Sequence, residues 1–361
     1  MRITHLIPMS TLGGPINQLS LLLSESSTCQ LDHSLLFWSR DKDLPDSVRT
    51  NLDAPISTVR SHGILGGLKQ LRRCISQSKP DILHIWHPYL LNWEHLGLLH
   101  RVGAKIVCSM GNPADRWIRY PTHAFKFYVR RSDHVIFSST AQQEFAQQFL
   151  KIGASSVVYP SEQFTKSDHK ADIRQELGIS QTSFIIGAAG RLIPGKRLKD
   201  LIWSMEILKT VRDDIHLVVW GDGPQLKILQ EYARELDLLS HIHFVGWATD
   251  FQSRVQDCLC LISCSDAHGV SACAATASSA GIPFVSAGAK GTLELFVNGK
   301  NSLLFGPGDS GSLARCINNL VEDKSLSSQL VTDAKLLQET ALSPSRFADS
   351  YLKVFHTVAN E

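Results

Sequence analysis

The residue types best suited to chemistry lie in one short loop, residues 190–197, whose sequence is GRLIPGKR. This segment follows a predicted strand, precedes a predicted helix, and nearly matches the phosphate-loop pattern GxxxxGK followed by Ser or Thr. Its last position is Arg197, which has no hydroxyl to hold magnesium, so a nucleoside triphosphatase is disfavoured. Arg191 and Lys196 still place two cations in a glycine-bearing loop, and such a pair suits a diphosphate. The alternative interpretation is a pair of solvated loop charges.

A second stretch, residues 265–294, has the pattern of a loop and helix that could bind an anion. The apolar run before it, residues 258–262, predicts a buried strand, and the small residues of Ala272–Ala280 predict a tightly packed helix. Gly281 and Pro283 end that helix, because glycine accepts a left-handed cap and proline cannot continue the helix. The free N–H groups of a first helical turn attract anions, so we expect a phosphate site there.

The composition is that of a globular protein rather than a fibrous or disordered one. With 361 residues, the chain has room for two domains of ordinary size. Its net charge of +2 is too small to indicate nucleic-acid binding, and its eight cysteines, without a CxxC pair, indicate reduced thiols and no zinc site. The N-terminal apolar run is too short for a signal peptide, and no run approaches the roughly 20 residues that span a bilayer. We therefore expect a cytoplasmic protein.

Strands that alternate with helical patterns predict parallel sheets covered on both faces, in two halves of the chain. The strands predicted in the first half are residues 3–7, 33–38, 81–85, 105–109, 132–137 and 157–159. Those predicted in the second half are residues 184–188, 216–220, 242–245, 258–262 and 284–286. The turn Gly221-Asp222-Gly223-Pro224 lacks the third glycine of a dinucleotide fingerprint, so we interpret it as a plain turn.

In order and spacing, these motifs resemble those of the group 1 (family 4) glycosyltransferases over nearly the whole chain. The motifs that carry the resemblance are Gly190-Arg191 with Lys196, the Gly221-Asp222-Gly223-Pro224 turn, Phe244-Val245-Gly246, Gly281-Ile282-Pro283, Gly291 with Glu294, and Asn298-Gly299-Lys300-Asn301. The resemblance implies the GT-B fold, an α/β architecture of two Rossmann-like domains whose parallel sheets face across a cleft. It implies an acceptor-side domain at residues 1–163, a nucleotide-sugar-binding domain at 164–342, and a helix at 343–361 that returns to the first domain.

The resemblance also implies a retaining glycosyltransferase that takes its sugar from a nucleotide-diphosphate sugar and needs no metal or other cofactor. Arg191 and Lys196 would hold the diphosphate and stabilise it as it leaves, and Gly13 and Gly14 would let the backbone approach it closely. Further donor contacts are implied for the backbone of Gly269, Val270, Ser271 and Ala272, and for Trp247 beside the base.

The chain departs from the family at two glutamates, eight positions apart, that contact the donor. Those positions hold His268 and Thr276. A hydrogen bond to a charged group contributes about 1.5–3 kcal/mol, so each missing carboxylate weakens donor binding about ten- to a hundredfold. His268, a candidate catalytic residue, can bond sugar hydroxyls, Thr276 offers one hydroxyl, and Glu294 is a candidate replacement. The alternative is a catalytically inactive GT-B protein that serves as a binding or scaffold protein.

For the acceptor side, the resemblance implies a glycan, a lipid-linked sugar or another small acceptor, as in polysaccharide or cell-envelope biosynthesis. The candidate residues are His87, beside Trp86 at a strand end, and Asn112, after the next strand. Segments 116–120 and 125–131 mix aromatic with cationic residues, as in relatives that dock on anionic membranes. Peripheral contact at the cytoplasmic face of a membrane is one interpretation, and a core helix with a solvated basic edge is the other.

Overall fold

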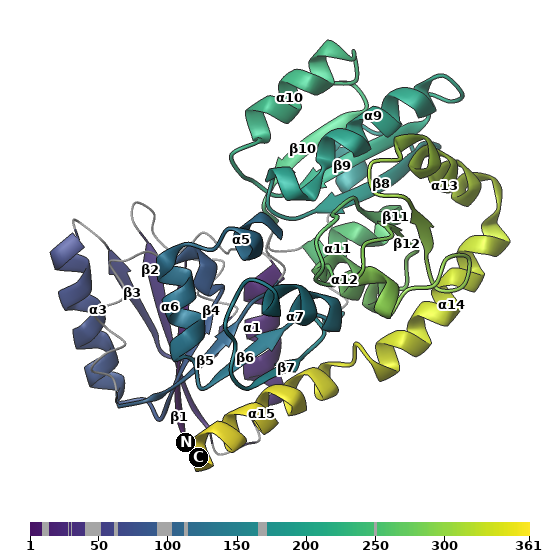
Figure 1. The fold of residues 1–361 in the computed structure, drawn as a ribbon. Helices are drawn as coiled ribbons and strands as arrows, with labels where there is room; N and C mark the ends of the chain where they lie inside the picture. Colours follow the sequence, from purple (N-terminus) through teal and green to yellow (C-terminus); the bar gives the residue numbers. More distant parts are fainter. Residues whose placement is uncertain are drawn as a thin grey trace. The chain divides into compact units, whose positions relative to one another are not determined.

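The computed structural model describes residues 1–8, 14–27, 29, 31–39, 52–60, 64–91, 103–111, 115–164, 172–248 and 251–361. Contacts between residues divide the chain into two compact units, which are described separately (Figure 1). Unit 1 comprises Met1–Tyr159 and the C-terminal Pro344–Glu361, and unit 2 comprises Pro160–Ser343. Within the described ranges, no helix combines the length and the apolar character that a membrane crossing requires.

Unit 1 is built on a seven-stranded parallel sheet with the strand order β3-β2-β1-β4-β5-β6-β7. The strands are β1 (Arg2–Pro8), β2 (Asp32–Ser39), β3 (Ile56–Arg60), β4 (Ile82–Trp86), β5 (Lys105–Ser109), β6 (His134–Phe137) and β7 (Ser155–Val157). The chain begins in the middle of the sheet at β1, extends outward through β2 and β3, and returns to β4 on the other side of β1. The order of the strands therefore changes direction between β1 and β4.

Different helices cover the two faces of the unit 1 sheet. Alternation along β1 sends Ile3 and Ile7 to the face covered by α1 (Gly14–Glu25) and α15 (Pro344–Asn360), and Leu6 to the other face. On that second face, Leu71 of α3 (Ile64–Ser78) and Tyr128 of α6 (His123–Arg131) share one apolar cluster with Leu6. The remaining helices are α5 (Asp115–Arg119), α7 (Thr140–Gln147) and the short 3-10 helix η2 (Pro88–Leu90).

Unit 2 has a six-stranded parallel sheet with the strand order β10-β9-β8-β11-β12-β13. The strands are β8 (Phe184–Ala189), β9 (Ile215–Trp220), β10 (Ile242–Gly246), β11 (Cys258–Ser263), β12 (Phe284–Ala287) and β13 (Leu303–Phe305). The helices are α8 (Ile173–Leu177), α9 (Leu198–Lys209), α10 (Leu226–Glu235), α11 (Phe251–Arg254), α12 (Ala272–Ala280), α13 (Ser310–Glu322) and α14 (Lys324–Thr340), with 3-10 helices η4 (Pro194–Lys196), η5 (Val255–Asp257) and η6 (Thr292–Glu294). This unit also begins in mid-sheet, at β8, and returns from β10 to β11 beside β8.

The strands predicted from the sequence are confirmed in both units, with ends that shift by one or two residues. The helix predicted at residues 272–280 is α12, and Gly281 closes it in the left-handed conformation, with φ of 69°. The sequence missed β3 and β13, which are edge strands of five and three residues. β3, with the sequence ISTVR, contains only two apolar residues, and β13 contains only three residues in all, so neither gives a clear apolar run.

Candidate active site

The two candidate anion-binding segments meet where the strand order of unit 2 changes direction. β8 and β11 are neighbours in the sheet, although β9 and β10 separate them in the sequence. Residues 190–197, here called the cation loop, leave the carboxyl end of β8, and residues 264–271 leave the carboxyl end of β11. In open parallel sheets, ligands bind outside the carboxyl ends of the strands at such a switch point. The topology therefore brings both segments to the expected place for a ligand.

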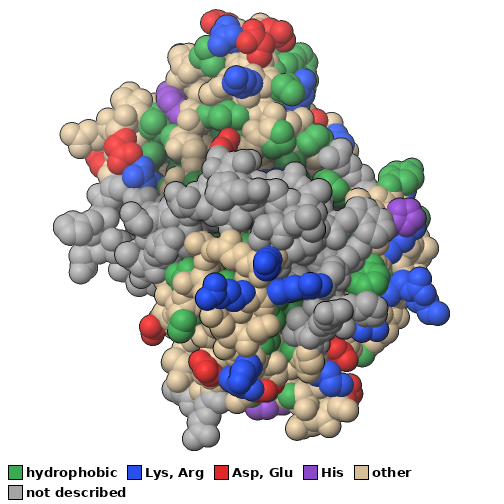
Figure 2. Space-filling view, turned by 90° about the vertical axis from the view of Figure 1, so that its left-hand side faces the viewer, with side chains coloured by type: hydrophobic (Ala, Val, Ile, Leu, Met, Phe, Trp, Pro, Cys, Tyr) green, Lys and Arg blue, Asp and Glu red, His purple; other side chains and the backbone are tan. Residues whose placement is uncertain are grey.

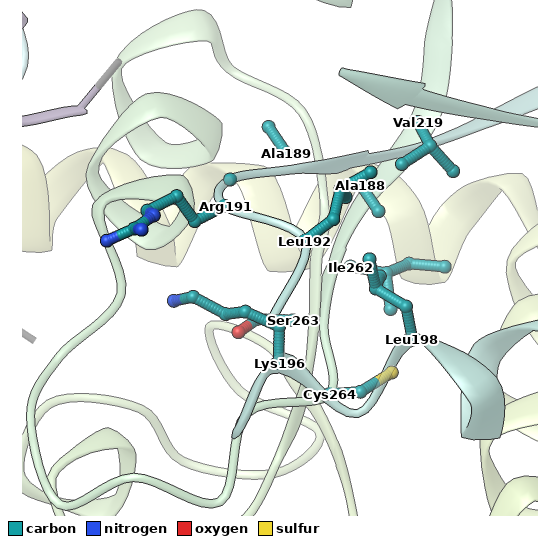
Figure 3. A pocket seen from close by; sticks show the side chains of 11 residues that line it. Ala188, Ala189, Arg191, Leu192, Lys196, Leu198, Val219, Ile262, Ser263 and Cys264 are labelled. Carbon is teal, nitrogen blue, oxygen red and sulfur yellow. The ribbon is translucent and has the colours of Figure 1, made fainter. Parts of the chain in front are cut away.

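Arg191 and Lys196 extend from the cation loop to the same side of a small pocket (Figure 3). The apolar side chains of Leu198, Val219 and Ile262 lie on the other side of it. Both cationic side chains are half-buried, and neither makes a hydrogen bond or an ion pair with any residue that the structure describes. A diphosphate at this place would therefore meet two unpaired cations from a single loop.

Lys196 lies in surroundings that disfavour its charge. Burial of the ammonium group lowers the pKa of Lys196, an effect that the neighbouring Cys273 opposes only in part. Cys273 belongs to the first turn of α12, and its thiol donates a hydrogen bond of 3.2 Å to the Ala189 carbonyl oxygen. Because burial raises the pKa of this thiol, Cys273 is neutral at pH 7 and provides no counter-ion. Lys196 therefore has no anionic partner among the residues that the structure describes.

The turn at residues 221–223 packs against the backbone of the cation loop. The backbone N–H of Gly190 donates to the Trp220 carbonyl oxygen over 2.9 Å, and that of Leu192 donates to the Asp222 carbonyl oxygen over 2.9 Å. A Cβ atom on Gly221, whose φ is 140°, would lie 2.0 Å from the Gly190 carbonyl oxygen. The turn thus has a packing role that the sequence did not predict, because its contact with the cation loop joins segments that follow different strands.

Arg197 joins the cation loop to the segment after β11. Its backbone is left-handed, with φ of 51°, a conformation that is unfavourable for residues other than glycine. Its guanidinium donates to Asp200 Oδ2 over 2.6 Å and to Asp266 Oδ2 over 3.3 Å. Ser265 adds a second link by donating to the Gly195 carbonyl oxygen over 3.2 Å. The position that lacks a phosphate-loop hydroxyl therefore carries a structural bridge, and Asp266 is one of its two anchors.

The segment before α12 is tightly packed, and no side chain caps the helix. The N-cap residue, Ser271, makes no side-chain hydrogen bond to the first turn. Gly269 and Val270 before it are buried. A Cβ atom on Gly291 would lie 1.9 Å from the His268 carbonyl oxygen, so this contact between two loops requires glycine. The first-turn amides of α12 are therefore held in place without a side-chain cap of their own.

The two positions that depart from the glutamate pair have different surroundings. His268 is half-buried in the loop after β11. Thr276 lies inside α12 with only 3% of its surface exposed, and its hydroxyl donates to the Ala272 carbonyl oxygen over 3.2 Å. The Thr276 hydroxyl thus donates its proton to a hydrogen bond within the helix, and it can only accept a hydrogen bond from a ligand. Glu294, the candidate replacement, is half-buried at the end of η6.

The remaining predicted contacts are distributed over both units. Trp247 directly follows β10 and exposes 40% of its surface. Ala272 is the first residue of α12, and Gly14 is the first residue of α1 in unit 1. Gly13 and Asn112 lie outside the residues that the structure describes.

In unit 1, His87 stands at the carboxyl end of β4 in a strained backbone conformation. It is a left-handed residue, with φ of 53° and ψ of 61°, and its side chain is largely buried. The imidazole stacks on Tyr89, with ring centroids 5.5 Å apart, and packs against Gly111 after β5, where a Cβ atom would lie 2.1 Å from His87 Nε2. A left-handed backbone is uncommon for a residue other than glycine, and the acceptor-side role of His87 stays a prediction.

The described part of the chain offers no metal centre. No group of three His, Cys, Asp or Glu side chains in it could share a metal ion. The eight cysteines are free thiols, and five of them are buried.

Two protein-family models match the chain, one in each half. The model described as Glycosyltransferase Family 4 matches residues 33–160, and the model described as Glycosyl transferases group 1 matches residues 169–336, which include the cation loop and α12. The chain belongs to the group 1 glycosyltransferases. Its activity is therefore glycosyl transfer, in agreement with the named glycosyltransferase relatives.

This glycosyltransferase is similar to two lipopolysaccharide core biosynthesis glycosyltransferases of Rhizobium meliloti. It is 22% identical to LpsD over 74% of this chain and 79% of LpsD, and 23% identical to LpsE over 88% of this chain and 86% of LpsE. Its fold is similar to that of Anabaena Alr3699/HepE in complex with UDP-glucose, with a TM-score of 0.81, 19% identity, and coverage of 99% of this chain and 100% of that one. The predicted GT-B fold with two Rossmann-like domains is confirmed.

Proposed function

We propose that this chain is a retaining glycosyltransferase that binds a nucleoside diphosphate sugar over the carboxyl ends of β8 and β11. The observation that carries the proposal is the pair of unpaired cations, Arg191 and Lys196, beside the uncapped first turn of α12. Cys273 ties that turn to the end of β8, so the cations and the helix amides act on one small volume. Guanidinium, ammonium and helix N–H groups together suit a diphosphate.

In the proposed reaction, the acceptor hydroxyl oxygen bonds to the anomeric carbon as the bond from that carbon to the distal phosphate oxygen breaks. Negative charge grows on the leaving diphosphate, where Arg191, Lys196 and the first-turn amides of α12 stabilise it. The leaving phosphate oxygen takes the proton of the acceptor hydroxyl. Because these groups neutralise the departing charge, the proposed reaction requires no metal ion.

We further propose that the donor pocket binds its sugar and ribose with fewer charged contacts than a pocket with two glutamates. His268 would contact sugar hydroxyls and Thr276 would only accept a hydrogen bond, since its proton is bonded to the Ala272 carbonyl oxygen. Glu294 would supply a carboxylate from the glycine loop that packs on His268. We therefore expect weak donor binding. The loss of one charge-assisted hydrogen bond lowers the affinity about ten- to a hundredfold relative to a pocket with both glutamates.

The named relatives suggest the substrates to test first. LpsD and LpsE act in lipopolysaccharide core biosynthesis, and Alr3699/HepE binds UDP-glucose. We propose by analogy that the acceptor is a glycan or a lipid-linked sugar, with His87 and Asn112 on the acceptor side, and that the donor carries a nucleoside diphosphate. UDP-glucose is the first donor to test, with GDP- and ADP-sugars as the comparison.

The proposal is tested by calorimetric titration of the full chain with these donors, and by donor turnover in EDTA. We expect binding of one nucleoside diphosphate series and turnover that persists in EDTA. Arg191→Gln should weaken binding more than tenfold, since it removes a charge-assisted contact of about 1.5–3 kcal/mol. The matched control is Lys227→Gln, an exposed lysine on α10, which should bind like the wild type. If no donor binds, or if both variants behave alike, the proposed site is wrong.

We also propose that unit 1 touches an anionic membrane surface through the exposed edges of α3 and α6. Both helices pack on the same face of the sheet, and neither contains an acidic residue. Figure 2 shows Lys and Arg side chains gathered on this side of the molecule. The exposed cations on the two helices are Lys69, Arg72, Arg73, Lys126, Arg130 and Arg131. Each cation near an anionic surface contributes about 1 kcal/mol.

Co-sedimentation with vesicles tests the membrane contact. We expect the chain to bind vesicles of phosphatidylglycerol but not of phosphatidylcholine, with binding lost at high salt. Replacing Lys126, Arg130 and Arg131 with Gln should weaken vesicle binding strongly without changing donor affinity, because half of the exposed cations of the two helices are removed. If this triple variant sediments with anionic vesicles as well as the wild type does, α6 is only a core helix with a solvated basic edge.

A further inference from the structure

Three histidines align across neighbouring strands of unit 1, on the face that α15 covers. His33 lies on β2, His5 on β1 and His84 on β4, and His5 and His84 are paired in register. His5 Nδ1 is 3.0 Å from His84 Nδ1, and His5 Nε2 is 2.9 Å from His33 Nδ1. Phe355 of α15 contacts the rings of His5 and His84, with centroids 6.4 and 5.3 Å away. His5 and His84 are fully buried, whereas His33 is partly exposed.

A tryptophan determines which nitrogen atoms carry the protons. The indole N–H can only donate, and Trp86 Nε1 donates to His5 Nδ1 over 3.4 Å. His5 Nδ1 is therefore an acceptor, so the proton between His5 and His84 belongs to His84 Nδ1. It follows that neutral His5 carries its own proton on Nε2 and donates it to His33 Nδ1.

At the end of the row near α1, the last ring nitrogen is hydrogen-bonded to a serine hydroxyl. His33 Nε2 is left as the donor to Ser26 Oγ, 3.1 Å away. Ser26 Oγ in turn donates to the Leu22 carbonyl oxygen over 2.5 Å. The directions assigned from Trp86 therefore agree with the partners at this end of the row.

At the end of the row near α15, the last ring nitrogen is also hydrogen-bonded to a hydroxyl group. His84 Nε2 carries no proton and accepts from Ser109 Oγ over 2.7 Å. Ser109 Oγ accepts from the Tyr351 hydroxyl of α15 over 3.1 Å. We call His33, His5 and His84, with Ser26, Ser109 and Tyr351, the histidine chain. With these directions, every ring nitrogen of the histidine chain takes part in a hydrogen bond.

The charge state follows from the same surroundings. Burial, together with the neighbouring His84 and His33 rings, lowers the pKa of His5 well below its usual range. Burial lowers the pKa of His84 to about 3, with a smaller effect from His33. Burial also lowers the pKa of His33, although Asp32 on the same strand acts in the opposite direction. Tyr351 faces the chain from α15, and burial raises its pKa, so it stays neutral. The closed chain is therefore neutral.

We propose that the histidine chain makes the docking of α15 on the unit 1 sheet depend on pH, with the helix held at neutral pH and released in acid. Undocking removes Phe355 and Tyr351 from the rings and exposes His5 and His84 to water. In water these rings bind a proton with a pKa near 6.5, whereas the docked rings do not. Each ring therefore favours the undocked state by about tenfold for each pH unit below about 6.5. Docking is complete above this pH and is lost as the pH falls toward the lower values of the docked rings.

Hydrogen–deuterium exchange of the full chain at pH 7.5, 6.0 and 5.0 tests the proposal. After correction for the intrinsic exchange rate, peptides from α15 should lose at least tenfold protection between pH 7.5 and 5.0. Peptides from α14 should retain theirs, because the histidine chain lies wholly in unit 1. Equal protection of α15 at all three pH values would overturn the proposal. This series on the wild type decides the matter without any variant.

Two variants distinguish the effect of the histidine chain on the docking of α15 from other sources of acid sensitivity. Tyr351→Phe retains the ring that packs against the sheet but removes the hydroxyl donor, so α15 should exchange several-fold faster at pH 7.5 and keep its pH dependence. His356→Gln removes an exposed histidine of the same helix and should change neither quantity. If His356→Gln abolishes the pH dependence, the buried rings are not its origin.

Discussion

The histidine chain of unit 1 and the cation loop of unit 2 are both polar clusters associated with parallel strands, but they differ in how many of their groups are paired. In the histidine chain, each ring nitrogen of His5 and His84 has a hydrogen-bonding partner. In the cation loop, Arg191 and Lys196 have none among the described residues. A network whose hydrogen-bonding groups are all paired stabilises the fold and leaves no group to bind a ligand. Unpaired cations reduce the stability of the fold but can bind an anionic ligand. Open hydrogen-bonding capacity therefore distinguishes the binding site from the structural cluster.

The largest effect is expected from a methyl group placed under the cation loop. Gly221→Ala puts a Cβ atom 2.0 Å from the Gly190 carbonyl oxygen, so the loop has to move. We expect donor binding to fall below detection and stability to drop by about 2–4 kcal/mol, measured by calorimetry and chemical denaturation. Gly299→Ala is the control, since its φ is also positive, at 72°, but no atom lies near its Cβ position. Similar donor binding by the two variants would contradict the supporting role of Gly221.

Removing both cations should separate binding from stability. Replacing Arg191 and Lys196 with Gln removes two charge-assisted contacts, so donor affinity should fall about a hundred- to ten-thousandfold. Stability should stay the same or rise, because burial lowers the pKa of Lys196 and its charge is unfavourable in the free protein. Isothermal titration and thermal unfolding measure the two quantities. A clear fall in the melting temperature would mean that these cations have structural partners.

The histidine chain should respond in the opposite sense. Ser109→Ala leaves His84 Nε2 and the Tyr351 hydroxyl without partners, which should cost about 2–4 kcal/mol of unfolding free energy and leave donor affinity unchanged. Ser278→Ala is the matched control, since this buried hydroxyl has no hydrogen-bond partner among the described residues. Its loss should be neutral or stabilising. Equal costs in the two variants would show that the chain contributes no more than an ordinary buried serine.

The smallest expected effect is a pH dependence of donor binding. The pKa of Lys196 is lowered by burial, so its ammonium group loses its proton at a lower pH than an ordinary lysine. Donor affinity should therefore be constant near neutral pH and fall by up to about tenfold per pH unit once the pH exceeds this pKa. Titration calorimetry between pH 7 and 10 measures the fall. Lys196→Arg should remove it, because a guanidinium stays charged in this range.

Features that depend on a few consecutive residues were predictable. The alternation of strands and helices, the start and end of α12, and the two cations between β8 and α9 follow from local spacing and from the backbone properties of glycine and proline. The resemblance to group 1 glycosyltransferases rests on the same local motifs and is confirmed by the family models. The ion pair between Arg197 and Asp266 was not predictable in this way, because the two residues belong to loops that follow different strands.

The sequence by itself determined which residue types exist at each strand end, and with them the fold and the class of reaction. Only the tertiary structure decided which of these ends are neighbours. The pairing of β1 with β4 joins His5 to His84, and the pairing of β8 with β11 brings Arg197 to Asp266. Such contacts depend on the strand order and register of the whole sheet, which no local pattern encodes, because strands far apart in the sequence pair only when the sheet forms.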